Sequence, residues 1–384
     1  MLELSQVMTD IGAMGVEAAR RRAKTGTQLQ TALQKARMSE AEWKTEQTRQ
    51  WGVKTSWRVA DAPEPPSVTY GLPSDAPAIY TALATDGSQI PLDRHAVAPC
   101  YLLNVGEITL HYGTGERPRL ASQATLHYKD EEIYQSDGGE PIPLSEKIIA
   151  NRRLLAESGA LARLIAENHP RHAIALVDDP LIVWTPPGEP EADQRKVIDE
   201  FCEMLEAGRQ AQIPVVGYVS RPGGRDVVGA LRLTLCDPQC KHGAKAPCAG
   251  LAALSDAQVF HALLPKLGDR SPLFGSDAPS LKLYPEAHRI QFFYLNVGAE
   301  IARLEVPKWV ADDTALLDRV QVLAVDQARK GQGYPVALSE AHERAVIRGA
   351  ERDAFFRLVE NAFVRQNIPA LQTRKALSKR TRVL

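Results

Sequence analysis

From about residue 79 onward, short apolar runs alternate with longer segments of helical periodicity, and this alternation is the strongest constraint on the fold. The predicted strands are 79–85, 101–105, 107–112, 123–128, 173–177 and 214–219, with 101–105 and 107–112 forming a hairpin around Gly106. The predicted helices are 145–167, 192–211 and 339–363. Strands followed by strand–helix alternation predict an α/β fold in which helices flank a sheet.

The residues before this region differ from it in composition. Residues 1–59 lack proline and are rich in Ala, Gln, Lys, Arg and Glu, which predicts an N-terminal helical arm. Within it, residues 25–51 have few large apolar side chains, so we expect an arm or hairpin rather than part of a core. Residues 60–78 contain five prolines and predict an extended linker. The main domain is then expected over 79–368, followed by a basic tail at 369–384.

Overall composition excludes several classes of protein. The chain has 384 residues, with 46 Lys and Arg against 47 Asp and Glu, so bulk positive charge cannot make it coat nucleic acid. Its apolar runs are shorter than the roughly 18 residues of a membrane span, and its N-terminus lacks the residue order of a signal peptide. Five cysteines in so long a chain do not form a disulfide framework, so we expect a cytoplasmic protein.

Two nucleotide-binding motifs are absent from the sequence. It contains no G-x-x-x-x-G-K-[ST] phosphate loop, and no G-x-G-x-x-G opens a helix after a strand. We therefore expect neither ATP hydrolysis nor a dinucleotide cofactor. Any ATP-driven motor that works with this protein must be another polypeptide.

Two carboxylates follow predicted strands directly. Asp86 comes after 79–85 and is followed by Gly87 and Ser88, which we expect to turn the backbone away from the strand. Asp178 follows 173–177 in the same way. Asp-Gly and Asp-Asp-Pro also form turns for purely structural reasons. Since active sites of α/β proteins lie at the carboxyl ends of strands, the pair is nevertheless a candidate site.

A third acid and a histidine lie on predicted helices. Glu157 falls on the apolar stripe of helix 145–167, where a carboxylate is costly unless it is paired or binds a metal. Glu146 shares that side but lies in the first turn, where an acid suits the helix dipole. His342 is expected in the first turn of helix 339–363. Three oxygen ligands and one imidazole would suit Mg²⁺ or, with the nitrogen, Mn²⁺, and such sites hydrolyse phosphodiesters.

Several segments of the chain resemble the NurA family of nucleases in family order. The more specific segments are ATDGSQI at 84–90 and GYPVALSEAHERAVI at 333–347. Looser segments are YLLNVGEITLHYG at 101–113, ALVDDPLI at 175–182, GYVSRP at 217–222, DRSPLF at 269–274 and FFYLNVGAEIARLEVPKWV at 292–310. The resemblance extends from about residue 79 through the last long helix.

The resemblance implies a ribonuclease H-like mixed sheet and a Mn²⁺-dependent deoxyribonuclease. It places the family's metal aspartates on Asp86 and Asp178, with Asp179 as a rival, and its histidine on His342. It places the family's helix glutamate on Glu157, the residue that the apolar stripe of helix 145–167 indicates independently. It also implies a homodimer and a 5'-3' exonuclease, with endonuclease activity as an addition. The implied partner is a HerA-type hexameric ATPase that acts in double-strand-break end resection or anti-phage defence.

A second metal-binding pattern lies outside these segments. Cys236, Cys240, His242 and Cys248 form C-x3-C-x-H-x5-C in a loop rich in Pro, Gly and Lys. Three thiolates and an imidazole would satisfy tetrahedral zinc, although the spacing is not that of a standard ribbon or finger. Cysteines without a metal are the alternative interpretation.

Basic residues that could contact DNA phosphates are scattered along the chain. Arg221 and Arg270 lie in loops, and Arg374 and Lys375 belong to the basic tail. A structural role for the single arginines and a solvated tail are the alternatives. For the whole protein, the rivals to a nuclease are a catalytically inactive adaptor of the translocase and a zinc-stabilised DNA-binding module.

Overall fold

A computed structural model describes most of the chain. In this part, no helix is both long and apolar enough to cross a membrane. The described residues are 3–50, 52–93, 98–137, 139–168, 172–184, 190–237, 239–241, 243 and 246–367.

The chain divides into two compact units, each assembled from separate segments. Unit 1 comprises Met1–Ala76, Asp179–Thr185 and Val216–Pro335. Unit 2 comprises Pro77–Asp178, Pro186–Val215 and Val336–Leu384. The main domain expected over 79–368 therefore contributes residues to both units, and its boundaries remain a prediction.

The strands form the mixed sheet that the sequence predicted, in the order β3-β2-β1-β6-β7-β10-β9-β8. In unit 2, β1 pairs antiparallel with β2 and parallel with β6, and β2 pairs antiparallel with β3. In unit 1, β10 pairs antiparallel with β7 and β9. The strands are β1 (Tyr80–Ile90), β2 (Tyr101–Tyr112), β3 (Arg119–His127), β6 (Ala173–Val177), β7 (Val215–Val219), β8 (Phe274–Gly275), β9 (Ile290–Asn296) and β10 (Ile301–Pro307).

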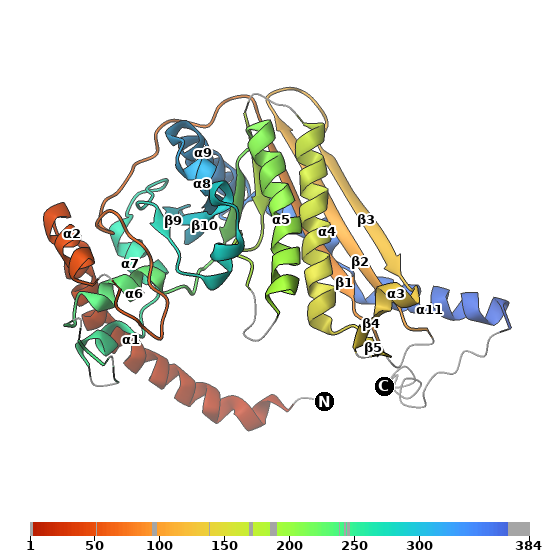
Figure 1. Ribbon diagram of the computed structural model, residues 1–384, viewed down its shortest axis with the longest axis horizontal. Coiled ribbons are helices and arrows are strands. Elements are labelled where there is room, and N and C mark those ends of the chain that lie inside the picture. Colours follow the sequence, from red (N-terminus) through yellow and green to blue (C-terminus); the bar gives the residue numbers. More distant parts are fainter. Residues whose placement is uncertain are drawn as a thin grey trace. The chain divides into compact units, whose positions relative to one another are not determined.

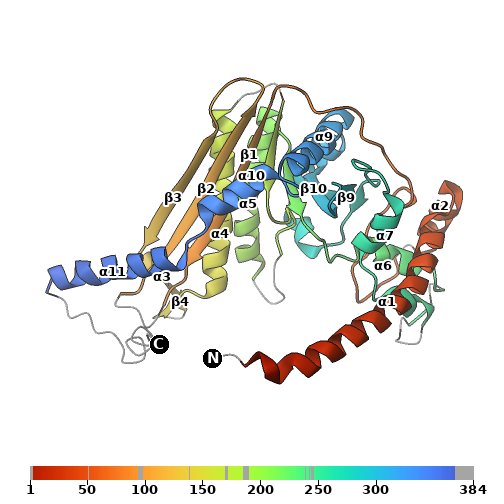
Figure 2. The ribbon, with the colours of Figure 1, turned by 180° about the vertical axis from the view of Figure 1, so that it is seen from behind.

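Helices cover both faces of the strands in unit 2. On one face, α4 packs on β1 and β2 and lies beside α5 (Figure 1). On the opposite face, α10 crosses the same two strands (Figure 2). The remaining elements of unit 2 are α3 (Asp130–Ile133), β4 (Tyr134–Asp137), β5 (Glu140–Pro143), α4 (Glu146–Glu167), α5 (Glu191–Ala211), α10 (Val336–Ala345) and α11 (Gly349–Arg365).

Two predictions about the first strands were wrong. The chain does not turn away at Gly87 and Ser88, because β1 continues to Ile90 and pairs with β2 along its whole length. Nor do residues 101–112 form a hairpin, because β2 passes straight through Gly106, which pairs with Asp86. In both places the glycine allows a neighbouring element to approach the strand rather than reversing the chain.

The predicted C-terminal helix 339–363 is two helices. It is interrupted at 346–348, so that α10 ends at Ala345 and α11 begins at Gly349. His342 consequently lies near the end of α10 and not in a first turn. The predictions for α4, β6, α5 and β7 agree with the structure to within one residue at each end.

Unit 1 packs helices against the second group of strands. Its apolar core joins side chains of α6, α7, β9 and β10 to side chains of the first two α-helices. Its elements besides strands are η1 (Leu4–Val7), α1 (Met8–Ala36), α2 (Glu40–Arg49), α6 (Asp226–Leu233), η2 (Pro247–Leu251), α7 (Asp256–Leu263), η3 (Pro279–Leu283), η4 (Glu286–His288), α8 (Lys308–Ala311) and α9 (Thr314–Lys330).

The N-terminal helices are more than an arm. The first half of α1 is exposed, as expected, but Ala32, Leu33, Ala36 and Trp43 are buried in the core of unit 1. The Trp43 indole donates a hydrogen bond to the carbonyl of Ala62 at 2.7 Å. The small number of large side chains in this region did not predict a core role, because two of these four buried residues are alanines.

The proline-rich segment is packed against unit 1. Ala60 and Ala62 are buried, and Asp61 forms a β-bridge with Gly275. Tyr70 forms another bridge with Arg270. Residues 60–70 include bends and a turn at Pro66 and Ser67, and these contacts hold them on the surface of the unit rather than leaving them as the free extended linker expected from the sequence.

Candidate functional site

The candidate site is built on the point at which two parallel strands of unit 2 stop pairing. Thr85 of β1 is in register with Val177, the last residue of β6. Asp86 and Asp178 follow these two residues directly, so the two aspartates lie at the same end of the β1–β6 pairing, although Asp86 itself remains within β1 and pairs with Gly106. Asp178 is exposed, whereas the side chain of Asp86 is only 17% exposed.

Asp86 is in direct contact with His342 on α10. The imidazole Nδ1 lies 2.9 Å from Oδ2 of the carboxylate. The other carboxylate oxygen, Oδ1, accepts the backbone N–H of Gly87 at 2.8 Å. The side chain of His342 is 60% exposed, so its ring can meet a ligand from solvent while Asp86 orients it.

Glu157 approaches β1 from α4, on the other face of the sheet. It is 7% exposed, as its place on the apolar stripe predicted, whereas Glu146 is exposed. A Cβ built on Gly87 would lie 2.2 Å from Oε1 of Glu157. Gly87 is therefore the residue that lets this carboxylate reach the strand next to Asp86.

Arg153, one turn earlier on α4, fixes this arrangement. Its Nη1 lies 3.3 Å from Oε1 of Glu157 and donates to the carbonyl of Gly87 at 2.7 Å. Thr85 Oγ1 also donates to the backbone carbonyl of Glu157 at 3.1 Å. The ion pair offsets the cost of burying the carboxylate.

Ser88 and Asn104 hold the end of α10 over the strands. They are paired in register, and both donate to the carbonyl of Ala345, Asn104 Nδ2 at 2.7 Å. Because the last carbonyls of a helix lack partners within the helix, these bonds cap it. Gly106 permits the close packing, since a Cβ there would lie 2.4 Å from the carbonyl oxygen of Ala341.

Asp178 and Asp179 differ in their surroundings. Asp178 closes a segment of unit 2, the unit that contains Asp86, Glu157 and His342, whereas Asp179 opens a segment of unit 1. The backbone carbonyl of Asp179 packs against Gly217, where a Cβ would lie 2.8 Å from it. Both aspartates are exposed, and the choice of Asp178 as the second aspartate of the site remains a prediction.

The four candidate side chains are of the kinds that bind hard divalent cations. Three carboxylates and one imidazole match the ligands of Mn²⁺ and Mg²⁺. Gly87 also leaves room beside Asp86 that Glu157 fills. Asp86 and His342 are in contact. Among the described residues, however, only the three cysteines of the cluster at Cys236, Cys240 and Cys248 have ligand atoms that all lie within 4.8 Å of one another, so the four candidate ligands are not gathered around one point.

Comparison with known proteins decides the family. The NurA domain model matches residues 80–347. The chain belongs to the NurA family. A search among functionally curated proteins found no match.

A solved NurA nuclease shares its fold with this chain. The NurA nuclease from Sulfolobus solfataricus is 12% identical, with a TM-score of 0.53, over 93% of this chain and 98% of that chain. A NurA structure bound to dAMP and manganese is 13% identical, with a TM-score of 0.42, over 97% and 99% of the two chains. Together with the strand order, the Sulfolobus likeness confirms the predicted ribonuclease H-like fold.

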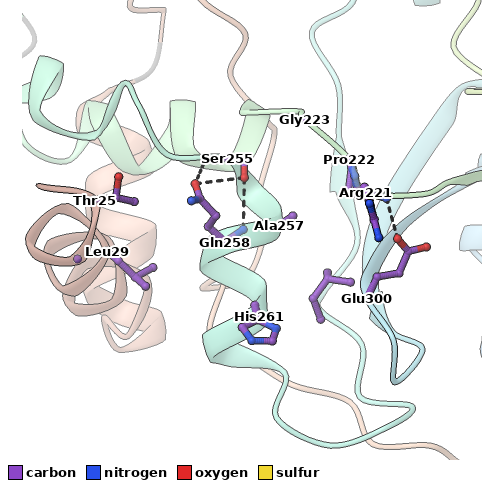
Figure 3. Close-up of a pocket in the computed structure, with 12 residues that line it drawn as sticks. Thr25, Leu29, Arg221, Pro222, Gly223, Ser255, Ala257, Gln258, His261 and Glu300 are labelled. Carbon is purple, nitrogen blue, oxygen red and sulfur yellow. Dashed lines mark hydrogen bonds between the residues drawn. The ribbon is translucent and has the colours of Figure 1, made fainter. Parts of the chain in front are cut away.

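The residues predicted to bind DNA lie in different environments of this NurA-family chain. Arg221 is exposed and lines a pocket of unit 1, opposite Thr25 and Leu29 of α1 (Figure 3). Its backbone N–H donates to Glu300 at 3.0 Å. Arg374 and Lys375 lie outside the described residues.

Arg270 is part of the core of unit 1 and is not available to a phosphate. It is 6% exposed, and its guanidinium lies 4.1 Å from the centroid of the Tyr70 ring. Its Nε donates to Gln321 at 3.0 Å. The prediction that Arg270 contacts DNA is therefore wrong, because a buried and paired guanidinium cannot reach DNA.

The predicted zinc ligands are only partly described. Cys236, Cys240 and Cys248 lie close together in unit 1, with sulfur atoms within 4.8 Å of one another. His242 lies outside the described residues. This cluster shares no residue with the candidate site around Asp86.

Sequence reasoning missed three residues that shape the site: Arg153, Ser88 and Asn104. The sequence favours turn formation at Gly87 and Ser88, whereas their roles are to admit Glu157 and to cap α10. The one available signal for Arg153 was its position four residues before Glu157, a spacing that places the two side chains on one face of a helix.

Proposed function

We propose that this NurA-family protein is a metal-dependent deoxyribonuclease that hydrolyses phosphodiester bonds at DNA ends. The observation that carries the proposal is the contact between Asp86 and His342, with Glu157 held against the next residue of the same strand. Asp86, Glu157, Asp178 and His342 do not all meet at one point in the structure, so we propose that these four residues would move closer together to hold Mn²⁺ or Mg²⁺. The bound cation would activate water and neutralise charge on the scissile phosphate.

The chain's own groups would prepare this reaction in distinct ways. Asp86 orients the His342 ring through Nδ1, which leaves Nε2 for a ligand or for proton exchange with the leaving oxygen. Arg153 holds Glu157 in place through their ion pair. Ser88 and Asn104 fix the end of α10 and with it the position of His342.

A cleavage assay tests the proposal directly. Linear duplex and single-stranded DNA would be incubated with the full-length protein and Mn²⁺, Mg²⁺ or EDTA. We expect cleavage with Mn²⁺, none with EDTA, and none by a folded Asp86→Ala variant. Full activity of that variant would overturn the assignment, and an inactive wild-type protein, even with a translocase and ATP, would favour the inactive adaptor.

The polarity and the biological setting belong to the same proposal. We propose 5'-3' exonuclease activity, with additional endonuclease activity, in double-strand-break end resection or in anti-phage defence. Substrates blocked and labelled at either end test the polarity, because a 5'-blocked end should stop degradation and a 3'-blocked end should not. Covalently closed circular DNA tests endonuclease activity.

We further propose that the protein acts in the cytoplasm as a homodimer with a HerA-type hexameric ATPase. The absence of a phosphate loop from the sequence supports a separate motor. An assembly partner is supported by the first half of α1, which exposes the apolar side chains of Met8, Ile11, Met14 and Val16. Light scattering of the protein alone tests for the homodimer, and light scattering of the protein with the ATPase tests for the complex. A protein that is monomeric and binds no ATPase would contradict both proposals.

A further inference from the structure

Three of the five cysteines converge at one place in unit 1. The sulfur atoms of Cys236, Cys240 and Cys248 all lie within 4.8 Å of one another. None of the five cysteines, all in the described part of the chain, forms a disulfide. Cys236 and Cys248 are buried, and Cys240 is half-buried.

The three side chains come from three separate local structures. Cys236 follows the end of α6, where its N–H donates to the carbonyl of Leu233 at 3.1 Å. Cys240 closes a turn through a bond from its N–H to the carbonyl of Asp237 at 2.9 Å. Cys248 lies in the first turn of η2. The three sulfur atoms are thus brought together from three different local structures.

Neighbouring polar side chains hold the cysteine backbones in place. Arg49 and Gln50 of the α2 region each donate to the carbonyl of Cys236 at 3.0 Å. Arg232 Nε donates to the carbonyl of Cys248 at 2.9 Å, and its guanidinium lies 3.6 Å from the centroid of the Trp57 ring. The two arginines therefore fix the backbone on both sides of the cluster.

The segment that carries the cysteines buries little else. Between Cys236 and Cys248, the described residues are exposed apart from Cys240 and Ala246, which are half-buried. Few apolar side chains of this segment are therefore available to hold it, and a bound metal would supply the missing stabilisation. Buried cysteines can also act as small apolar side chains, but that role does not explain the half-exposed Cys240.

The separation of the sulfur atoms suits a tetrahedral zinc ion. With Zn–S bonds of about 2.3 Å, three thiolates on one ion lie roughly 3.8 Å apart, within the limit that the cluster satisfies. Three residues separate Cys236 from Cys240, which falls within the usual C-x2–4-C spacing. We propose that Cys236, Cys240 and Cys248 bind a structural Zn²⁺ that fastens the segment after α6 to η2.

The proposal is independent of the nuclease assignment, because the cluster lies in unit 1 and the site around Asp86 lies in unit 2. The fourth ligand of the ion must come from outside the three thiolates. The proposed role is structural: releasing the ion should loosen the segment between α6 and η2 and lower the unfolding temperature.

Metal analysis of the full-length protein is the primary test. Protein produced with zinc in the medium and freed of loose ions should contain about one zinc per chain by mass spectrometry, a stoichiometry that one closed site requires. After exchange with Co²⁺ it should show the thiolate-to-cobalt charge-transfer band of a sulfur-rich site. Zinc-free protein that also fails to show this band with Co²⁺ would overturn the proposal.

Matched cysteine variants locate the ion. Cys236→Ser and Cys248→Ser should each lose most of the zinc and the cobalt band, whereas Cys202→Ala should retain both, because Cys202 is as buried as Cys236 but lies on α5. Asp86→Ala should retain the zinc even though it loses cleavage. Should the serine variants fail to fold, thiol-reagent titration of wild-type protein provides the second measurement: zinc must be released as three thiols react. Zinc retained in folded Cys236→Ser and Cys248→Ser would refute the site.

Discussion

The imidazole Nδ1 of His342 lies 2.9 Å from Oδ2 of Asp86, although 256 residues separate the two in the chain. The contact joins the third residue of the ATDGSQI segment to the histidine of the GYPVALSEAHERAVI segment. Each residue of the central Asp-Gly-Ser has its own partner: Asp86 contacts His342, Gly87 admits Glu157, and Ser88 caps α10. The motif is therefore an anchor for two helices on opposite faces of one strand.

Removing the His342 ring should slow cleavage without unfolding the protein. His342→Ala removes an exposed side chain, so we expect unchanged thermal unfolding and a rate about 10²–10⁴-fold lower, the usual contribution of a general acid or base. Rates at saturating Mn²⁺ measure this loss. A Mn²⁺ titration then separates the two roles, because loss of a ligand raises the half-saturating concentration and loss of a proton donor does not. A variant as fast as wild type would contradict the prediction.

The two neighbouring aspartates should differ in effect. Asp178→Asn should reduce Mn²⁺-dependent cleavage by more than about 100-fold, exceeding the loss typical of groups that only support a metal ligand. Asp179→Asn should cut nearly as well as wild type, because only Asp178 directly follows β6, whose last residue is in register with Thr85 next to Asp86. Parallel assays of the two purified variants measure the difference. If Asp179→Asn lost more activity than Asp178→Asn, the metal ligand would be Asp179.

Adding a methyl group at Gly87 should displace the carboxylate of Glu157 from the site. The Cβ of Gly87→Ala would lie 2.2 Å from Oε1 of Glu157 and 2.9 Å from its Cδ, so the carboxylate must move. We expect a loss of about 1–3 kcal/mol in the free energy of unfolding, with loss of cleavage. Denaturant unfolding and the cleavage assay measure the two effects.

Gly159→Ala is the matched control for this substitution. Gly159 lies on the same helix as Glu157, and a Cβ added there would meet open space. This change should preserve cleavage and raise stability by up to about 1 kcal/mol, because alanine favours a helix over glycine. Equal effects of the two substitutions would show that the contact between Gly87 and Glu157 is unimportant.

Asp256 should make the stability of unit 1 depend on pH. It is fully buried and accepts hydrogen bonds from Val227, Val228 and the Tyr294 hydroxyl. Burial raises the pKa of Asp256 from 3.8 to about 6. Because the folded state holds this proton more tightly than the unfolded state, stability from this group is full below about pH 4 and is lost as pH rises to about 6.

Asp256→Asn should remove that dependence. A shift of about two pH units corresponds to about 3 kcal/mol, so wild type should lose up to this amount relative to the variant between about pH 4 and pH 6. Above about pH 6 the difference in the free energy of unfolding between wild type and the variant should stay constant. Denaturant midpoints measured across this range test the prediction, and a constant difference at every pH would contradict it.

Local pattern was enough to predict the elements of unit 2 that are bounded by clear signals. Strand β6 is a fully apolar run, and α4 begins after Ser145, whose hydroxyl accepts the backbone N–H of Ile148 at 3.3 Å. The burial of Glu157 followed from its place on an apolar stripe. Prediction failed at glycine, because a glycine that admits another element has the same local sequence as a glycine that forms a turn, as Gly87 and Gly106 show.

The sequence by itself determined the class of fold, the family and the residue types available for chemistry, because hydrophobic periodicity and short motifs are local properties of the chain. Only the tertiary structure decided which of those residues meet. It brought His342 to Asp86 through the packing of α10, removed Arg270 from the surface, and gathered Cys236, Cys240 and Cys248. These outcomes depend on contacts between distant segments, whose geometry is set by packing and register rather than by any one stretch of sequence.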